Sequence, residues 1–302
     1  MNHNIRIGTA SWADPEFVRD WYPQKLPARE RLRFYSERFD LVELNSSFYG
    51  IPDRRQVEEW NRVTPEGFLF DIKLHKALSR HSAERNSLPR ELQKLLGTGK
   101  RVTLDVELER AIVQHLLTVV EPLVTSGKLG SFLLQLTPGF SPRAHRLDEL
   151  ATLLEQFRPH QVAVEFRNRS WVKEERLPET LAFLREHSAA FVCVDAPEVD
   201  HFTVMPALDA VTAPLGYLRL HGRDAKAYLK GKTVAERFNY QYSEEELKGI
   251  AERSAKLSAQ AEQVHVIFNN NSSNHAPVAA RQLRQLFGQN PGPLVEMPPK
   301  VV

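Results

Sequence analysis

The chain has 302 residues, of which 42% are hydrophobic and 26% are charged, as in soluble globular proteins with a substantial core. Its formal net charge of +2 is too small to indicate nucleic-acid or membrane binding by itself. No apolar run is long enough to cross a bilayer and no secretory signal pattern opens the sequence, so we expect a cytoplasmic protein with no membrane partner. The single cysteine, Cys193, excludes a disulfide within the chain and fits a reducing compartment.

Strand patterns recur along the chain, and amphipathic helical patterns separate them. The expected strands cover residues 5–10, 41–46, 68–75, 131–136, 162–166, 190–196, 216–222 and 264–270. The clearest helical patterns cover residues 27–39, 147–157, 242–257 and 276–287. The third of these begins at Ser243 with Glu246 three residues later, which predicts a capping box.

Eight strands that alternate with helices predict a parallel α/β fold, either a closed (β/α)₈ TIM barrel or an open doubly wound sheet. The strands of an open sheet would be apolar on both faces, because helices cover both. Here polar and apolar residues alternate, as where Phe70 and Ile72 flank Asp71. We therefore expect a single TIM-barrel domain over residues 1–288, an elaborated loop and helix region after the third strand, and a Pro-rich tail over residues 289–302.

The polar phase of these strands should point into the barrel, toward the carboxyl ends where barrel proteins have their sites. Barrel interiors are usually filled by Val, Ile and Leu, so charged residues on so many strands indicate a use beyond packing. The expected inward set is Glu43, Asn45, Asp71, Lys73, His75, Gln135, Glu165, Arg167, Asp195, Arg219, His221 and Asn269.

Seven ordered blocks support this assignment from a different direction. They are IGTASWADPEFVRDWYPQKLP, VELNSSFYGIP, VEEWNRVTPEGFLFDIKLHKALSRH, LLQLTPGF, AVEFRNRSW, YLRLHGR and FNNNSSNHAPVAARQL. In these blocks the chain resembles the YecE-like family, a bacterial domain family of unknown function, from about Ile5 to Phe287. The resemblance implies a TIM barrel without an established activity, and a relation to the barrel of apurinic endonucleases has been proposed for relatives. Thr137, Asn271 and Asn274 stand where relatives often carry Pro, Asp and Gly.

The favoured functional hypothesis is a site for an anionic, phosphate-bearing small molecule. Lys73, Arg167 and Arg219 are the expected anion-binding residues, because guanidinium and ammonium groups bind phosphate and carboxylate. The remaining expected binding residues are Asn45, Tyr49, Gln135, Trp171, Asn269 and Asn270. The expected catalytic residues, as general acids, general bases or orienting groups, are Glu165, Asp195, Glu43 and His221. Whether the site is catalytic is left open.

Other functions are kept as alternatives. Glu165, Asp195 and His221 on successive strands would suit a divalent metal in an isomerase-like, epimerase-like or endonuclease-like barrel, although no cofactor is expected. Glu43 and Glu165 could act as the two carboxylates of a glycosidase. The inward charges could form a purely structural network, or the protein could be a non-catalytic module that binds nucleic acid through a basic rim. The sequence does not predict the oligomeric state.

Overall fold

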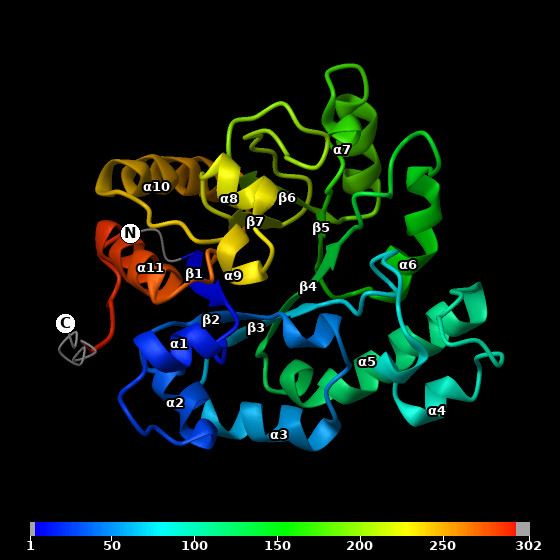
Figure 1. The fold of residues 1–302 in the computed structure, drawn as a ribbon, viewed down its shortest axis with the longest axis horizontal. Helices are drawn as coiled ribbons and strands as arrows, with labels where there is room; N and C mark the ends of the chain where they lie inside the picture. The colour runs from blue at the N-terminus through cyan, green and yellow to red at the C-terminus, as the bar shows by residue number, and fades with distance from the viewer. Residues whose placement is uncertain (1–3, 294–302) are drawn as a thin grey trace.

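The computed structural model describes residues 4–293, and these form a closed barrel of eight parallel strands in sequence order. Figure 1 shows the strands at the centre with the helices around them. All eight expected strands are confirmed, with bounds β1 (Ile5–Ala10), β2 (Leu41–Leu44), β3 (Leu69–Lys73), β4 (Leu129–Gln135), β5 (Val162–Glu165), β6 (Ala190–Asp195), β7 (Leu215–Leu220) and β8 (Gln263–Phe268). The predicted (β/α)₈ barrel is therefore confirmed, and the doubly wound alternative is wrong.

The register of the strands fixes which side chains point into the barrel. Glu43 is opposite Asp71 in the β2–β3 pair, and Gln135 is opposite Glu165 in the β4–β5 pair. Because successive side chains of a strand point to opposite faces, paired residues share a face, and these four all point inward. The alternate residues of the strands, such as Ile72, face the helices and are fully buried there.

Helices follow the strands and cover the outside of the barrel (Figure 1). Their bounds are α1 (Pro15–Asp20), α2 (Arg31–Ser36), α3 (Arg54–Val63), α4 (Arg90–Gln93), α5 (Val106–Thr125), α6 (Ala151–Gln156), α7 (Leu177–Glu186), α8 (Ala225–Lys230), α9 (Val234–Arg237), α10 (Glu244–Ser258) and α11 (His275–Leu286). The predicted capping box at the start of α10 is present, since the Ser243 side chain accepts from the backbone of Glu246 and the Glu246 side chain accepts from that of Ser243. The helix expected over residues 27–39 is shorter than expected, a 3-10 turn at Ala28–Glu30 followed by α2.

The connection after β3 is elaborated, as expected. It contains a 3-10 turn at Arg85–Ser87, the short helix α4 and an isolated antiparallel bridge between Glu84 and Arg101 before α5 begins. None of the helices within residues 4–293 is long and apolar enough to cross a membrane. Most of the expected Pro-rich tail, residues 294–302, lies outside the described residues.

The connection after β7 matters most for the site. It carries α8 and α9, which lie in front of the barrel strands in the view of Figure 1. Residues of this connection, Ala235 and Phe238, line a cavity together with Lys73 at the end of β3. The connection therefore covers the carboxyl ends of the strands.

Candidate functional site

A cavity of about 530 Å³ lies at the carboxyl ends of the barrel strands. Its floor comes from the ends of β2, β3, β4, β5, β7 and β8, and its walls come from the connections after β1, β2, β3 and β7. The lining residues are Asp14, Pro15, Glu16, Asn45, Phe48, Tyr49, Lys73, His81, Gln135, Arg167, Arg219, Ala235, Phe238, Asn269 and Asn271. Seven of the expected site residues thus share one cavity: Asn45, Tyr49, Lys73, Gln135, Arg167, Arg219 and Asn269.

Arg219 lies at the floor of the cavity and joins two buried carboxylates. Its Nε and Nη2 donate to Glu43 Oε2 and Oε1 at 2.9 and 2.6 Å, and its Nη1 donates to Glu165 Oε2 at 2.5 Å. The hydroxyl of Tyr217 donates to Glu43 Oε2 at 2.9 Å as a further buried bond. All four side chains are buried. The guanidinium charge of Arg219 is therefore already matched by carboxylates of the protein.

Glu165 is the most heavily hydrogen-bonded carboxylate of the site. Besides Arg219, its Oε1 accepts from Gln135 Nε2 at 3.0 Å, from His221 Nε2 at 3.2 Å and from Arg167 Nη1 at 3.3 Å. Burial by itself raises the pKa of Glu165, but the nearby Arg219, His221 and Arg167 outweigh it and hold that pKa well below its usual range. Glu165 is thus an anion at neutral pH and has no proton to give.

His221 is held in one neutral form by its two neighbours. Burial lowers the pKa of His221 to about 4, more than Glu165 raises it. Asn269 Nδ2 lies 2.9 Å from His221 Nδ1, so this amide donates to Nδ1 and the proton of the ring sits on Nε2, which faces Glu165. Asn269 Oδ1 in turn accepts from Arg219 Nη2 at 3.3 Å. The floor is therefore a closed and largely satisfied hydrogen-bond network.

Lys73 differs from the other charged groups of the floor. Its Nζ lies 4.5 Å from the centre of the Phe48 ring, and no acceptor within residues 4–293 takes a hydrogen bond from it. Burial, followed by the positive charge of Arg219, lowers the pKa of Lys73 to about 7. The ammonium is thus only partly populated at neutral pH and has an open side toward the cavity.

Arg167 also has donor capacity left over. Its Nη1 contacts Glu165, and its Nη2 donates to the hydroxyl of Tyr228 at 3.0 Å, while its Nε is buried without a partner among the described residues. His81 Nε2, Asn45 Oδ1 and Asn271 Oδ1 are likewise buried without a partner in residues 4–293. Unpaired buried polar atoms are costly, and these four all belong to residues that line the cavity.

The wall opposite these cations is acidic. Asp14 and Glu16 come from α1 and the residue before it, directly after β1. Burial raises the pKa of Asp14 to about 6, against a hydrogen bond from Ser11 that lowers it. Glu16 Oε2 accepts from the hydroxyl of Ser272 and the backbone of Ser273. The cavity thus has a cationic side and an anionic side.

Comparison with known proteins identifies the family. The family model described as "Protein of unknown function DUF72" matches residues 6–301. This chain belongs to the DUF72 family. Among curated relatives of the DUF72 chain, the UPF0759 protein YunF of Bacillus subtilis is 29% identical over 94% of both chains. The UPF0759 protein YecE of Escherichia coli is 26% identical over 48% of this chain and 44% of its own. The resemblance to the YecE-like family is thereby confirmed.

Solved structures agree with this assignment. A DUF72 family protein from Thermotoga maritima superposes with a TM-score of 0.76 at 27% identity, covering 95% of this chain and 100% of its own. A DUF72 family protein from Enterococcus faecalis gives a TM-score of 0.74 at 28% identity, covering 95% and 99%. The description of the family names no function, so the chemistry of this DUF72 protein has to be argued from its own cavity.

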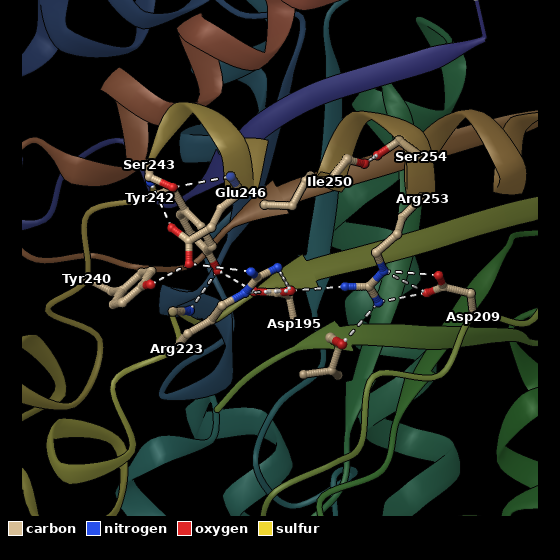
Figure 2. A network of polar contacts seen from close by, with 12 residues as sticks. Asp195, Asp209, Arg223, Tyr240, Tyr242, Ser243, Glu246, Ile250, Arg253 and Ser254 are labelled. Atoms are coloured by element: carbon tan, nitrogen blue, oxygen red, sulfur yellow. Dashed lines mark hydrogen bonds and ion pairs between the residues drawn. The ribbon is translucent and has the colours of Figure 1, made fainter. Parts of the chain in front are cut away.

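The placement expected for Asp195 is wrong, as Figure 2 shows. Val194, not Asp195, is opposite the inward Arg219 in the β6–β7 pair, so Asp195 points outward toward α10. It accepts from Arg223 Nη2 at 2.7 Å, from Tyr242 at 2.9 Å and from Arg253 Nη1 at 3.0 Å. Because Arg223 and Tyr242 stand at the two ends of the connection that carries α8 and α9, Asp195 fastens this connection from outside the barrel.

The proposed metal-ligand trio is consequently split. Glu165 and His221 meet inside the barrel, whereas Asp195 lies on the other face of the sheet. Within the described residues no group of three or more His, Cys, Asp or Glu side chains is arranged to hold a metal ion. These three residues therefore do not fit a common metal.

Three further expected residues lie away from the cavity. Trp171 is buried against Phe140, and its Nε1 donates to the Phe140 carbonyl at 2.7 Å. Asn270 is buried, and its Nδ2 donates to the carbonyl of Tyr240. His75 is buried after β3, where its Nδ1 accepts from the backbone of Ala77. These positions follow strand ends, where the two-residue period no longer fixes the direction of a side chain.

The cavity also contains residues that the sequence did not single out. His81, Asp14, Glu16, Phe238 and Asn271 line it, and all come from connections rather than strands. The motif IGTASWADPEF did contain Asp14 and Glu16, but nothing in its spacing indicated an inward direction. Below the cavity His265 was missed too, although its inward phase pairs its Nδ1 with Asp71 Oδ2 at 2.8 Å.

The cost of keeping Lys73 in this site predicts a stability effect. The Lys73→Met variant should unfold with a free energy about 1–3 kcal/mol higher than that of the wild type at pH 7, because the unfolded chain protonates a lysine at about 10.4 and the folded chain only at about 7. Between these values the unfolded state binds more protons, so wild-type stability from this group rises with pH. The gain should therefore shrink toward zero near pH 10.5.

Urea denaturation followed by circular dichroism from pH 6 to 10 measures this effect. Lys76→Met is the matched control, because Lys76 lies three residues away and does not line the cavity. Equal stability of the Lys73→Met variant and the wild type at pH 7 would contradict the assignment.

Proposed function

We propose that the cavity binds a small anionic molecule that carries a phosphate or carboxylate group. Arg167 and Lys73 would hold the anion. The observation that carries this proposal is that both side chains keep unused donors at the cavity, the Nε of Arg167 and the Nζ of Lys73. A guanidinium and an ammonium are the groups that proteins use for phosphate and carboxylate.

The charge distribution supports these two residues over Arg219. Arg219 is matched by Glu43 and Glu165, so a ligand would have to compete with two carboxylates of the protein. Glu165 is shared among four donors, which leaves Arg167 only part of one negative charge. Lys73 has no ion pair among the described residues. We therefore assign Glu43, Glu165 and Arg219 the role of positioning the floor.

The shape and charge of the cavity favour a small molecule over a nucleic-acid backbone. A volume of about 530 Å³ is within the range of small-molecule sites. Asp14 and Glu16 stand on the wall opposite the cations, where they would repel a polyphosphate chain. The same two carboxylates would suit a ligand that carries hydroxyl or amino groups at the end away from its anion.

The glycosidase alternative has less support. It requires one protonated carboxylic acid beside a carboxylate. Glu165 is held ionised, and Glu43 accepts three hydrogen bonds from Arg219 and Tyr217. Neither side chain is free to protonate a leaving group.

Sulfate is a suitable probe, because it stays a dianion across the pH range of interest. We expect calorimetry at pH 6.5 to detect sulfate binding to the wild type and a roughly ten- to hundredfold weaker affinity for the Arg167→Met variant, the loss of a charged hydrogen bond. The control is Arg146→Met, since Arg146 is 82% exposed and lies outside the cavity. Equal affinity of the wild type and the Arg167→Met variant would overturn the proposal.

The pH dependence tests the share of Lys73. If sulfate pairs with the ammonium, binding raises the pKa of Lys73 above its value of about 7 in the free protein. Affinity should then fall as pH rises from 6 to 9, by about tenfold for each unit by which sulfate raises that pKa. In the Lys73→Arg variant, whose charge does not titrate, the affinity should change little over this range. An identical pH profile for both proteins would contradict the role of Lys73.

A further inference from the structure

We infer that Lys73 is a nucleophile that condenses with a carbonyl group, so that the ligand of the cavity is an aldehyde or ketone that also carries an anion. This inference rests on the proposed function in one respect, that Arg167 holds the anionic end. It goes beyond binding, because it assigns a covalent imine between Lys73 Nζ and a carbonyl carbon of the ligand.

The geometry of Lys73 suits an attacking amine. It is the last residue of β3, points into the barrel with Asp71, and lines the cavity. Within residues 4–293 no carboxylate or carbonyl oxygen accepts a hydrogen bond from its Nζ, whose recorded contact is the face of Phe48. The lone pair of the neutral amine is therefore not blocked by an acceptor that would keep the nitrogen protonated.

A second lysine of the same chain shows the opposite arrangement. The Nζ of Lys128 donates to the carbonyl of Asn61 at 2.6 Å, to the carbonyl of Thr64 at 2.8 Å and to the Thr64 hydroxyl at 3.2 Å. Three acceptors use all three protons of an ammonium. Lys128 is thus a structural lysine, and the open amine of Lys73 is not a general consequence of burying a lysine in this fold.

The electrostatics support the same role. Burial and the neighbouring Arg219 lower the pKa of Lys73 to about 7, so about half of the side chain is neutral at pH 7. Desolvation and a nearby cation are the two means by which proteins activate a nucleophilic lysine. An anion directly against Nζ would raise that pKa again, so the anion should pair with Arg167 during the reaction while the carbonyl reaches Lys73.

The step balances without an oxidant or reductant. The lone pair of Nζ attacks the carbonyl carbon and forms a C–N bond, while the electrons of the C=O double bond move to oxygen. The carbinolamine then loses its oxygen as one molecule of water, which carries away the two protons of the amine. The C=N bond that remains is reversed by hydrolysis.

Reductive trapping tests the inference. The protein is incubated with glyceraldehyde 3-phosphate and sodium cyanoborohydride, and peptide mass spectrometry measures the labelling rate of each lysine. At pH 7.5 we expect Lys73 to be labelled at least tenfold faster than Lys128 or Lys76, faster by the phosphorylated aldehyde than by glyceraldehyde, and more slowly in the presence of sulfate. The rate at Lys73 should level off above pH 8, whereas that of exposed lysines keeps rising.

Variants exclude indirect effects. Labelling at position 73 should disappear in the Lys73→Arg variant, and the rate at Lys73 should be unchanged in the Lys76→Arg variant, whose substituted residue does not line the cavity. Sulfate binding by the wild type together with labelling of Lys73 no faster than that of other lysines would overturn the inference and leave the proposed function standing. Rapid labelling of Lys73 by both aldehydes alike, without competition by sulfate, would support the imine and contradict the anion site. Neither labelling nor sulfate binding would overturn both.

Discussion

Replacing Arg219 by methionine is expected to lower the free energy of unfolding by about 3–5 kcal/mol, the cost of breaking a buried ion pair. The variant leaves Glu43 and Glu165, both fully buried, without the guanidinium that neutralises them. Tyr217 alone would remain on Glu43, and Gln135, His221 and Arg167 on Glu165. Urea denaturation monitored by circular dichroism measures the loss.

A second variant shows whether the loss comes from the abandoned carboxylates. Replacing Glu43 and Glu165 by leucine together with Arg219→Met should recover most of the stability, because a buried ion pair often exchanges for apolar residues at little cost. The control Arg146→Met should change stability by less than about 1 kcal/mol, as is usual for an exposed ion pair. If Arg219→Met lost no more than this control, the floor would not depend on Arg219.

Replacing Asp195 by alanine is expected to lower the free energy of unfolding by about 3 kcal/mol, since hydrogen bonds to charged groups contribute about 1.5–3 kcal/mol each and some neighbours would find water. Arg223 and Tyr242 would lose the carboxylate that joins the ends of the connection over the cavity (Figure 2). Amide hydrogen exchange in residues 223–242 should therefore become faster, and sulfate binding should weaken with it.

Asp209 provides the matched control for this prediction. It shares Arg253 with Asp195 but contacts neither end of the connection, and it is 30% exposed. Asp209→Ala should cost about 1 kcal/mol or less and leave exchange in residues 223–242 unchanged. Similar exchange in both variants would mean that Asp195 does not fasten the connection.

The fold could be predicted from the strands because their polar and apolar residues alternate. Strands such as β3, where Phe70 and Ile72 flank Asp71, reveal their inward phase directly. In β6 the residues Ala190 to Val194 are apolar on both faces, so the sequence gives no phase. Only the register, with Val194 opposite Arg219, shows that Asp195 points outward. The wrong placement of Asp195 follows from this missing signal.

The site could be predicted only as far as strands build it. Glu43, Lys73, Gln135, Glu165 and Arg219 all meet as the alternation predicted. The walls come from connections, where backbone turns and tertiary contacts set side-chain directions. The sequence for this reason missed His81 and Glu16 and misplaced Trp171. It also could not separate the satisfied Arg219 from the open Lys73, since that difference depends on which acceptors lie nearby.

Anomalous diffraction from a crystal soaked in selenate tests the central claim most directly. Selenate has the charge and shape of sulfate, and its selenium can be located without assumptions about the protein. The account predicts a selenium peak in the cavity, within hydrogen-bonding distance of Arg167 Nε and on the side of Lys73, which is absent from crystals of the Arg167→Met variant. Selenate found only at exposed surface arginines, with none in the cavity, would contradict it.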